Sequence, residues 1–359
     1  MLSHAQSLLY RLFRIVLLTL SLLALMPAAQ AAEKKSFKIA WSIYVGWMPW
    51  DYAAQSGILK KWADKYGISI QLTQINDYVE SINQYTAGGF DGCVMTNMDM
   101  LTIPAAGGVD STALIIGDFS NGNDGVVLKG KGKTLANIKG LPVNLVELSV
   151  SHYLLARALE TAGMQERDIK VVNTSDADIV GAYAAADTKA TVTWKPQLSE
   201  IVAAKDAQLV FDSSRIPGEI IDLMVVNTAT LKANPKLAKA LVGAWYETLQ
   251  LMAAKDPKAL EHMARASGTD LAGFNSQLAT TKMFWTPAEA HAFATSSTVI
   301  KTMDLVRKFS FDHGLLGEGA KSVDAVGIEF PGGKTLGNAK SVKMRFDASY
   351  MKMAADGAL

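Results

Sequence analysis

Acidic and aromatic side chains occupy the loops between the apolar segments of this 359-residue chain. Three of its seven tryptophans lie in one stretch, WSIYVGWMPWD, which runs from Trp41 to Asp51 and has its only charge at the end. Carboxylates can balance a small cation, and the faces of aromatic rings attract cations as well. Both kinds of group can also contact a neutral molecule that carries several hydrogen-bond donors. These loops are therefore where we expect a binding site.

The candidate binding residues are of three chemical kinds, and we expect them where strands end and helices begin. The carboxylate candidates are Asp77, Asp118, Glu147 and Asp222. The aromatic candidates are Trp41, Tyr44 and Trp47 on one wall of a cleft and Trp194 on the other. The candidates for neutral hydrogen bonds at helix starts are Thr96, Asn97 and Ser149. Only Lys195 and Arg215 add positive charge to these loops, which disfavours an anionic ligand because such a ligand needs Arg or Lys.

Several of these residues also have a purely structural interpretation, and the sequence leaves both open. Asp77 is well placed to cap the helix that follows it. Asp118 lies close to Gly and Asn residues, where a role in a turn would explain it. Trp41 lies within an apolar strand and could belong to the core. Trp47 follows Gly46 in a loop, so it is the tryptophan that we expect to face a ligand.

No pattern in the chain predicts catalysis, a metal or a cofactor. The histidines after residue 31 are His152, His262, His291 and His313. None of them has the spacing of a metal-binding pair. The chain also lacks a GxSxG motif, a P-loop and a dinucleotide-binding fingerprint. Its one cysteine, Cys93, lies in an apolar segment, as buried free cysteines often do.

The first 31 residues have the pattern of a secretory signal peptide. Arg11 and Arg14 precede an apolar run from Ile15 to Met26, and small residues follow up to Ala31. That run is shorter than the roughly 20 residues that a membrane span needs. We expect cleavage after Ala31 and export to a bacterial periplasm. The formal charge of +1 shows no basic excess, so nucleic acid is not an expected partner.

Apolar segments typical of strands alternate with segments typical of helices, which favours an α/β fold with parallel-rich sheets. Strands are predicted at 37–43, 68–75, 90–96 and 111–120, and a single helix at 49–67. The alternation then restarts and continues to about residue 231, and the chain after Pro235 is predicted to be helical. Ligands bind at the carboxyl ends of strands in such sheets, where the candidate residues lie.

The chain resembles the periplasmic substrate-binding proteins of ABC importers, in the group of sulfonate, nitrate and thiamine-precursor binders. GWMPWDYAAQSGIL, AGGFDGCVMTNMDML, DFSNGNDGVVLK, SVSHYLLARALETAGM and ATVTWKPQL carry the resemblance in family order. It implies a two-lobed type II fold, with one lobe at 33–127 plus 226–359, the other at 128–225, and the ligand in the cleft between them. The lobes would close about a hinge. It also implies a binding protein rather than an enzyme, served by an inner-membrane ABC permease, and we expect a monomer.

Within that group, WSIYVGWMPWDYA and TNMDMLTIPAAGGVDSTALIIGDFSNGNDG resemble the subfamily associated with urea carboxylase. This resemblance implies urea or guanidinium as the ligand. Guanidinium is planar and carries only donors, so carboxylates in its plane and rings on its faces suit it. Urea needs a donor for its carbonyl oxygen as well. The acid-rich loops therefore favour guanidinium over urea.

Two rival interpretations remain open at this point. A binder of a pyrimidine or thiamine precursor, or of a short amine, would have a larger pocket with several rings and one carboxylate. A pyrimidine-synthase-like enzyme would use His152. Export disfavours the enzyme because such chemistry needs cytosolic cofactors.

Overall fold

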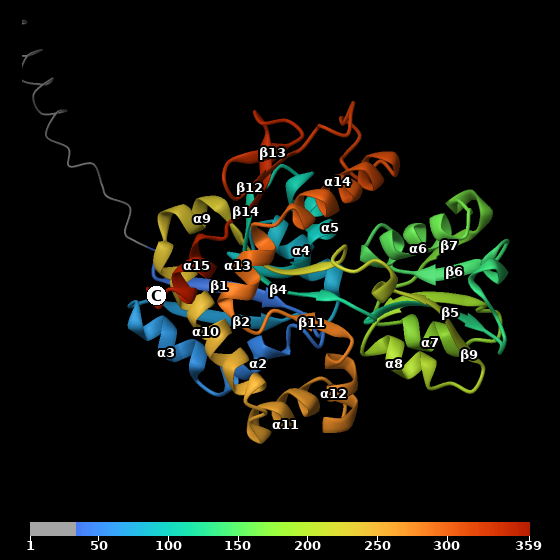
Figure 1. The fold of residues 1–359 in the computed structure, drawn as a ribbon, viewed down its shortest axis with the longest axis horizontal. Coiled ribbons are helices and arrows are strands. Elements are labelled where there is room, and N and C mark those ends of the chain that lie inside the picture. Colours follow the sequence, from blue (N-terminus) through green and yellow to red (C-terminus); the bar gives the residue numbers. More distant parts are fainter. Residues whose placement is uncertain (1–33) are drawn as a thin grey trace, which may run out of the picture. The chain divides into compact units, whose positions relative to one another are not determined.

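The larger of two β-sheets is built from the beginning and the end of the chain (Figure 1). The computed structural model describes residues 34–359, and the signal peptide predicted for residues 1–31 lies outside them. The strands of this sheet are β1 (Ser36–Trp41), β2 (Ser69–Gln74), β3 (Gly92–Thr96), β4 (Ser111–Ser120), β10 (Ile221–Asn227), β11 (Thr281–Met283), β12 (Gly327–Phe330), β13 (Lys334–Leu336) and β14 (Val342–Phe346).

Strand β10 is the key strand for the site, because it runs antiparallel between β3 and β4. The strand order is β13-β12-β14-β4-β10-β3-β1-β2, and β11 pairs with β4. The register places Asp222 of β10 opposite Thr96 of β3 on one side and opposite Asp118 of β4 on the other. β1 is parallel to both β2 and β3, so the loops after these strands leave the same edge of the sheet.

The smaller sheet is formed entirely by the middle of the chain. Its strands are β5 (Asp124–Lys129), β6 (Pro142–Leu145), β7 (Lys170–Asn173), β8 (Ala190–Trp194) and β9 (Ala207–Asp212). The order is β7-β6-β8-β5-β9, with β5 antiparallel to both of its neighbours. The chain therefore passes between the sheets twice, once between β4 and β5 and once between β9 and β10. The lobe boundaries at 127/128 and 225/226 remain a prediction.

Helices cover both sheets (Figure 1). The helices that contact the larger sheet or each other around it are α2 (Met48–Gln55), α3 (Ile58–Lys65), α4 (Tyr78–Thr86), α5 (Asn97–Met100), α9 (Thr228–Ala233), α10 (Pro235–Ala253), α11 (Pro257–Ala266), α12 (Leu271–Leu278), α13 (Pro287–Ala294), α14 (Ser297–Asp312) and α15 (Ser349–Ala355). The helices on the smaller sheet are α6 (Val150–Thr161), α7 (Ile179–Ala184) and α8 (Gln197–Val202). A short π-helix lies at η1 (Leu101–Ala105), and short 3₁₀-helices lie at η2 (Leu135–Ile138), η3 (Glu166–Asp168) and η4 (Ser213–Arg215).

Two predicted elements differ from the structure. The single helix predicted for 49–67 is two helices, α2 and α3, because Gly57 between them adopts a left-handed φ of 83° that ends an α-helix. The region after Pro235 is not helical throughout, since β11, β12, β13 and β14 join the larger sheet. These strands are only three to five residues long, too short to show a clear alternating pattern.

The fold class is the predicted one, α/β with two sheets flanked by helices. The core is largely continuous under the larger sheet, where Trp50 of α2 packs against Trp245 of α10 with ring centroids 4.9 Å apart. Both rings are buried, so these two tryptophans stabilise the helix layer and do not reach a ligand. Among residues 34–359, no helix combines the length and the apolar character that crossing a membrane requires.

Candidate ligand-binding site

A small hollow lies where elements of the two sheets meet. The volume of its cavity is about 20 Å³, which is room for about one water molecule. The residues that line it are Tyr44, Trp47, Tyr78, Thr96, Asp124, Val150, Trp194, Ile220 and Asp222. Trp194 ends β8 of the smaller sheet, whereas Thr96 ends β3 of the larger one. A ligand larger than water therefore enters this hollow only when the residues around it move apart.

Four aromatic rings form a continuous chain along the hollow. Tyr44 and Trp47 lie in the turn before α2, and their ring centroids are 5.1 Å apart at a steep angle. Trp47 is 5.6 Å from Tyr78, the first residue of α4, and Tyr78 is 5.6 Å from Trp194. The rings therefore run from the larger sheet to the smaller one. Several ring faces around one small space suit a cation or a flat molecule.

Asp118 and Asp222 face each other across neighbouring strands. They are register partners on β4 and β10, which places their Cβ atoms roughly 5 Å apart. Both carboxyl groups are buried, and the Oδ2 atom of each has no hydrogen-bond partner among the described residues. Tyr44 donates a hydrogen bond from its hydroxyl to Asp118 Oδ1 over 3.1 Å. Two buried like charges at this distance would repel, so the pair holds a proton unless a cation is bound.

Gly46 allows this arrangement because it has no side chain. A Cβ atom at position 46 would lie 2.4 Å from Asp118 Oδ2 and 2.6 Å from the Tyr44 ring. Both distances are shorter than any normal contact. The loop backbone can therefore pass directly over the Asp118 carboxyl group only with glycine at this position.

Two further buried carboxyl groups lie beside this pair. Asp124 accepts a hydrogen bond from the Ser120 hydroxyl over 2.5 Å. Asp99 accepts hydrogen bonds from the Tyr78 hydroxyl over 2.6 Å and from the Thr96 hydroxyl over 2.8 Å. These contacts use neutral donors only, so no positive charge balances either carboxylate. Arg and Lys are absent from the lining residues as well.

The pKa values of all four carboxyl groups are raised. Burial raises the pKa of Asp118 to about 7, although the contact with the Asp222 carboxyl group and the hydrogen bond from Tyr44 act in the opposite direction. The pKa of Asp222 lies well above its ordinary value, because of burial and then the charge of Asp118. Burial likewise raises the pKa of Asp124 to about 7 and that of Asp99 to about 6. A cluster of strongly perturbed groups in a hollow is typical of a functional site.

Five of the residues predicted from the sequence line this hollow: Tyr44, Trp47, Thr96, Trp194 and Asp222. Asp118 lies directly behind them, bonded to Tyr44. Asn97 is buried beside β10, where its amide donates to the Glu219 carbonyl over 3.1 Å and accepts from the Ile221 N–H over 3.0 Å. It therefore positions the start of β10.

The other four predicted residues are not among the lining residues. Asp77 caps α4 by accepting a hydrogen bond from the Glu80 N–H, and Ser149 caps α6 by accepting one from the Ser151 N–H. Trp41 is buried in β1. Glu147 is exposed on the smaller-sheet side. Direct contact of these residues with a ligand remains a prediction.

Sequence reasoning missed four lining residues: Tyr78, Asp124, Val150 and Ile220. Tyr78 and Val150 each directly follow a predicted residue, Asp77 and Ser149, so the prediction reaches the loops that line the hollow but names neighbouring positions within them. The first residue of a helix can point into a site that the capping residue does not reach. Asp124 lies among glycines and asparagines, a pattern that equally indicates a turn.

Comparison with known proteins places this geometry in a family. The chain is 22% identical to the taurine-binding periplasmic protein of Escherichia coli strain K12 over 177 residues, which are 47% of this chain and 55% of that protein. The chain thus spans about half the length of the curated relatives it matches. The alkanesulfonate-binding protein of Xanthomonas axonopodis pv. citri, solved with bound MOPS, has a TM-score of 0.65 at 18% identity, covering 80% of this chain and 96% of that one. The periplasmic aliphatic sulphonate-binding protein of E. coli gives a TM-score of 0.66 at 16% identity, covering 79% and 94%.

These structural likenesses show that the fold is that of periplasmic sulfonate-binding proteins. The narrower resemblance to a subfamily associated with urea carboxylase remains a prediction. A family model described as NMT1-like matches residues 30–267, about two thirds of the chain. The chain therefore belongs to the NMT1-like family.

Proposed function

We propose that this protein is the periplasmic solute-binding component of an ABC importer and that its ligand is a small cationic nitrogen compound, with guanidinium as the leading candidate. The fold and the names of the relatives support the general role. One observation supports the ligand class. Buried carboxyl groups and aromatic rings surround the hollow, and no Arg or Lys lines it.

A cation fits the charge balance of the hollow. Ionising Asp118 or Asp222 without a counter-charge is costly, as their raised pKa values reflect. Guanidinium would supply that charge, donate to the free Oδ2 atoms of both carboxylates, and lie against the rings of Trp47 or Trp194. The same two carboxylates then change from a source of repulsion to the main source of affinity.

Urea is the second candidate, and a specific observation supports it. Because the carboxyl groups have raised pKa values, one of them can be protonated at neutral pH and donate a hydrogen bond to a carbonyl oxygen. The two ligands then differ in pH dependence. A cation binds more tightly as the carboxyl groups ionise, whereas urea loses its donor.

The sulfonate-binding relatives raise the question of an anionic ligand. A sulfonate placed in this hollow would meet several buried carboxyl groups and no Arg or Lys, which is unfavourable. A flat pyrimidine precursor suits the four rings better, but it does not require several carboxylates. A short amine shares the charge of guanidinium and differs in having fewer donors.

An enzymatic role for His152 has little support. Its ring does not line the hollow, and its two nitrogens face the Leu148 N–H and Glu166. We therefore propose a binding protein that hands its ligand to a membrane permease. Export, cleavage after Ala31 and a monomeric state belong to the same proposal.

Calorimetric titration of the purified protein tests the proposal. The ligands are guanidinium, urea, taurine, nitrate, a short alkylamine and a formylated aminopyrimidine, each at neutral pH. We expect guanidinium to bind most tightly and the two anions not to bind. Binding of only the anions would overturn the assignment of a cationic ligand, and turnover of any of these compounds would overturn the assignment of a binding protein.

A further inference from the structure

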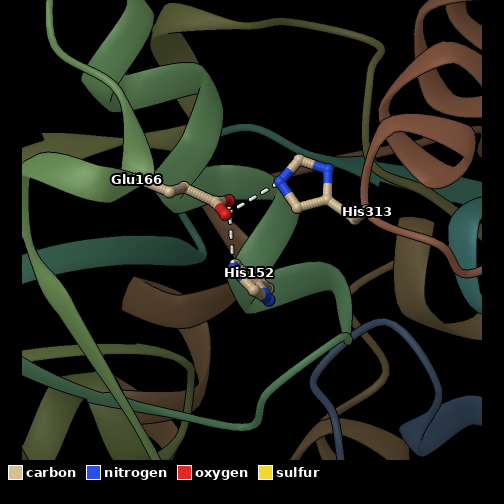
Figure 2. Close-up of side chains that lie close together, drawn as sticks. All are labelled: His152, Glu166 and His313. Carbon is tan, nitrogen blue, oxygen red and sulfur yellow. Dashed lines mark ion pairs between the residues drawn. The ribbon is translucent and has the colours of Figure 1, made fainter.

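Two histidines and a glutamate meet outside the hollow (Figure 2). His152 is the third residue of α6, Glu166 belongs to η3, and His313 follows the last residue of α14. His152 Nε2 lies 3.0 Å from Glu166 Oε1, and His313 Nε2 lies 2.8 Å from Glu166 Oε2. His152 is buried, and the other two side chains are about one quarter exposed. The carboxylate therefore lies between the two rings at ion-pair distance, although His152 Nε2 and Glu166 Oε1 do not have the geometry of a hydrogen bond.

This cluster connects elements that belong to different sheets. α6 packs on β5 and β8 of the smaller sheet, and η3 packs on β7. α14 instead packs on α5 and α13 beside the larger sheet. His152 lies only two residues from Val150, which lines the hollow. The bond between Glu166 and His313 is therefore a direct link across the cleft, close to its edge.

Hydrogen-bond partners fix where the protons are. The Leu148 N–H donates to His152 Nδ1 over 3.1 Å, so Nδ1 holds a lone pair and the ring proton is on Nε2. His313 Nδ1 lies 2.8 Å from the Phe309 carbonyl, which can only accept, so this nitrogen carries a proton. His313 Nε2 faces a carboxylate, which also only accepts when ionised. His313 must therefore be doubly protonated and positively charged.

The same reasoning disfavours a metal ion at this place. The ligand atoms of the three side chains lie within 4.8 Å of one another, which is close enough to suggest one. A metal on Nε2 of a neutral histidine requires a proton on Nδ1, which usually donates to an acceptor. His152 has the opposite arrangement, because its Nδ1 accepts a hydrogen bond. A proton on His313 accounts for all of the contacts.

We infer that Glu166 and His313 form a proton-dependent latch that holds the two sides of the cleft together. This inference rests on the proposed closure of two lobes around a ligand. It does not depend on which ligand is bound. When His313 loses its charge, the ion pair with Glu166 is lost. One ring nitrogen then holds a lone pair that faces an acceptor, either the Glu166 carboxylate or the Phe309 carbonyl, so the link weakens.

The surrounding charges leave His313 as the group that switches. His152 and Glu166 face it from the smaller-sheet side, and Asp312 lies beside it on α14. Lys308 on α14 is paired with Asp304, and Arg157 on α6 is paired with Glu160 and Glu219. Lys308 and Arg157 line the same surface groove as Glu166 and His313, but both already have partners.

The pKa shifts of His313 and Glu166 determine whether the latch forms at low or at high pH. The hydrogen bond with Glu166 raises the pKa of His313 above its ordinary value, against the effect of burial. Burial acts to raise the pKa of Glu166, but the contacts with both histidines outweigh it and lower this pKa to about 2. Glu166 thus stays ionised. The latch is complete below the ordinary histidine pKa of about 6.5 and is lost as the pH rises through the raised pKa of His313.

Distance measurements between two spin labels, made without ligand, test this inference. Exposed Lys60 on α3 and Lys170 on β7 are replaced by cysteine for labelling, because Cys93 is buried and does not compete. The otherwise unchanged protein should show a shorter, narrower distance distribution at about pH 5 than at about pH 8. His313→Gln and Glu166→Gln should remove this pH response, leaving a broad distribution at both pH values.

The control is His262→Gln. His262 also pairs with a carboxylate, Asp51, over 2.7 Å, but that pair joins α11 and α2 on the same side of the cleft. This variant should keep the full pH response. A distribution that does not change with pH, or a His313→Gln protein that responds like its parent, would overturn the inference. The inference would also be overturned, in favour of a metal site, by two results together. Added zinc would narrow the distance distribution in a way that a chelator reverses, and the chelated protein would show no pH response. None of these outcomes depends on whether guanidinium binds.

Discussion

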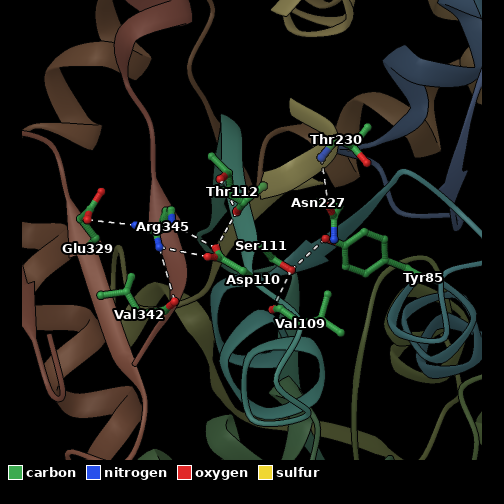
Figure 3. A network of polar contacts seen from close by, with 11 residues as sticks. Tyr85, Val109, Asp110, Ser111, Thr112, Asn227, Thr230, Glu329, Val342 and Arg345 are labelled. Atoms are coloured by element: carbon green, nitrogen blue, oxygen red, sulfur yellow. Dashed lines mark hydrogen bonds and ion pairs between the residues drawn. The ribbon is translucent and has the colours of Figure 1, made fainter. Parts of the chain in front are cut away.

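The two ends of strand β4 carry the same residue type in opposite electrostatic situations. Asp110 immediately precedes the strand, and Arg345 of β14 donates to both of its carboxylate oxygens over 2.9 and 3.0 Å (Figure 3). Thr228 adds a third hydrogen bond over 2.6 Å. Asp118, near the other end, accepts a hydrogen bond from the Tyr44 hydroxyl and faces the acid Asp222. One aspartate is therefore paired with a cation inside the protein, and the other is not.

Their pKa values move in opposite directions for this reason. Burial acts to raise the pKa of Asp110, but the bonds from Arg345 and Thr228 outweigh it and lower the pKa below its ordinary value. Burial raises that of Asp118 to about 7. A protein gains stability from the first arrangement and loses it in the second. An arrangement that costs stability and lies directly behind the lining of a hollow is what a binding site looks like before its ligand arrives.

The largest expected effect comes from removing the unpaired carboxylates. Asp222→Asn and Asp118→Asn should each weaken guanidinium binding by about 2–5 kcal/mol, or roughly 30- to 4000-fold, because a buried cation loses its partner. Calorimetry measures this loss. The matched control is Asp270→Asn, which keeps a capping side chain on α12 and lies outside the lining, so its affinity should not change. Equal losses in the control and in Asp222→Asn would contradict this account of the site.

Replacing the aspartate at each end of β4 by asparagine should change the free energy of unfolding in opposite directions. Asp118 has a raised pKa in the folded protein, so its contribution is present below its unfolded pKa of about 4 and is lost as the pH rises to about 7. Asp118→Asn should therefore stabilise the ligand-free protein at neutral pH, by up to about 4 kcal/mol.

Asp110→Asn is the counterpart of this variant. Its pKa is lowered, so its contribution is present at neutral pH and is lost as the pH falls, and the variant should be about 1–2 kcal/mol less stable. Denaturant unfolding at neutral pH measures both variants. If both substitutions changed the free energy of unfolding in the same direction, the proposed electrostatic difference between the two ends of β4 would be wrong.

The pH dependence of binding gives the next largest effect. A cation must displace a proton from a carboxyl group whose pKa is about 7. Guanidinium affinity should therefore fall about tenfold for each pH unit below 7 and level off above it, with one proton released per ligand at low pH. Titrations in buffers of different ionisation enthalpy count that proton. Affinity that increases toward low pH would instead favour urea.

The smallest expected effect concerns the ring contributed by the smaller sheet. Trp194→Leu should weaken cation binding by about 1–2 kcal/mol, because the ring face is lost while an apolar side chain remains. Trp194→Phe keeps a ring and should lose less. Titration of both variants separates ring electrostatics from simple packing. If the two variants bound equally well, the aromatic contact would not contribute through its charge distribution.

The sequence predicted the loops of the candidate site more reliably than the residues within them. Trp47, Thr96 and Trp194 were chosen because each lies where a strand ends or a helix begins, and all three line the hollow. Tyr78 also lines the hollow, but the sequence predicts its neighbour Asp77 instead. One residue along a helix start rotates the side chain by about 100°, so the hollow can receive one neighbour and exclude the other. No period or motif carries that information.

The pair of carboxyl groups shows most clearly what could not be predicted from the sequence. Asp118 and Asp222 are both in the predicted set, but they are far apart in the sequence. Their direct opposition depends on β10 inserting antiparallel between β3 and β4 after the chain has built the whole smaller sheet. Register between distant strands is set by which faces are buried. The sequence alone could not show that the two acids share one space.

Composition and local pattern by themselves determined the α/β class, the positions of most strands and an acid-rich, base-poor set of loops, because these depend on hydrophobic period and residue type. Tertiary structure alone decided which acids are unpaired. Arg345 neutralises Asp110 across more than 230 residues of chain, whereas no base within residues 34–359 pairs with Asp118. Charge pairing depends on distances of a few ångströms between segments remote in sequence. Only the folded chain sets those distances.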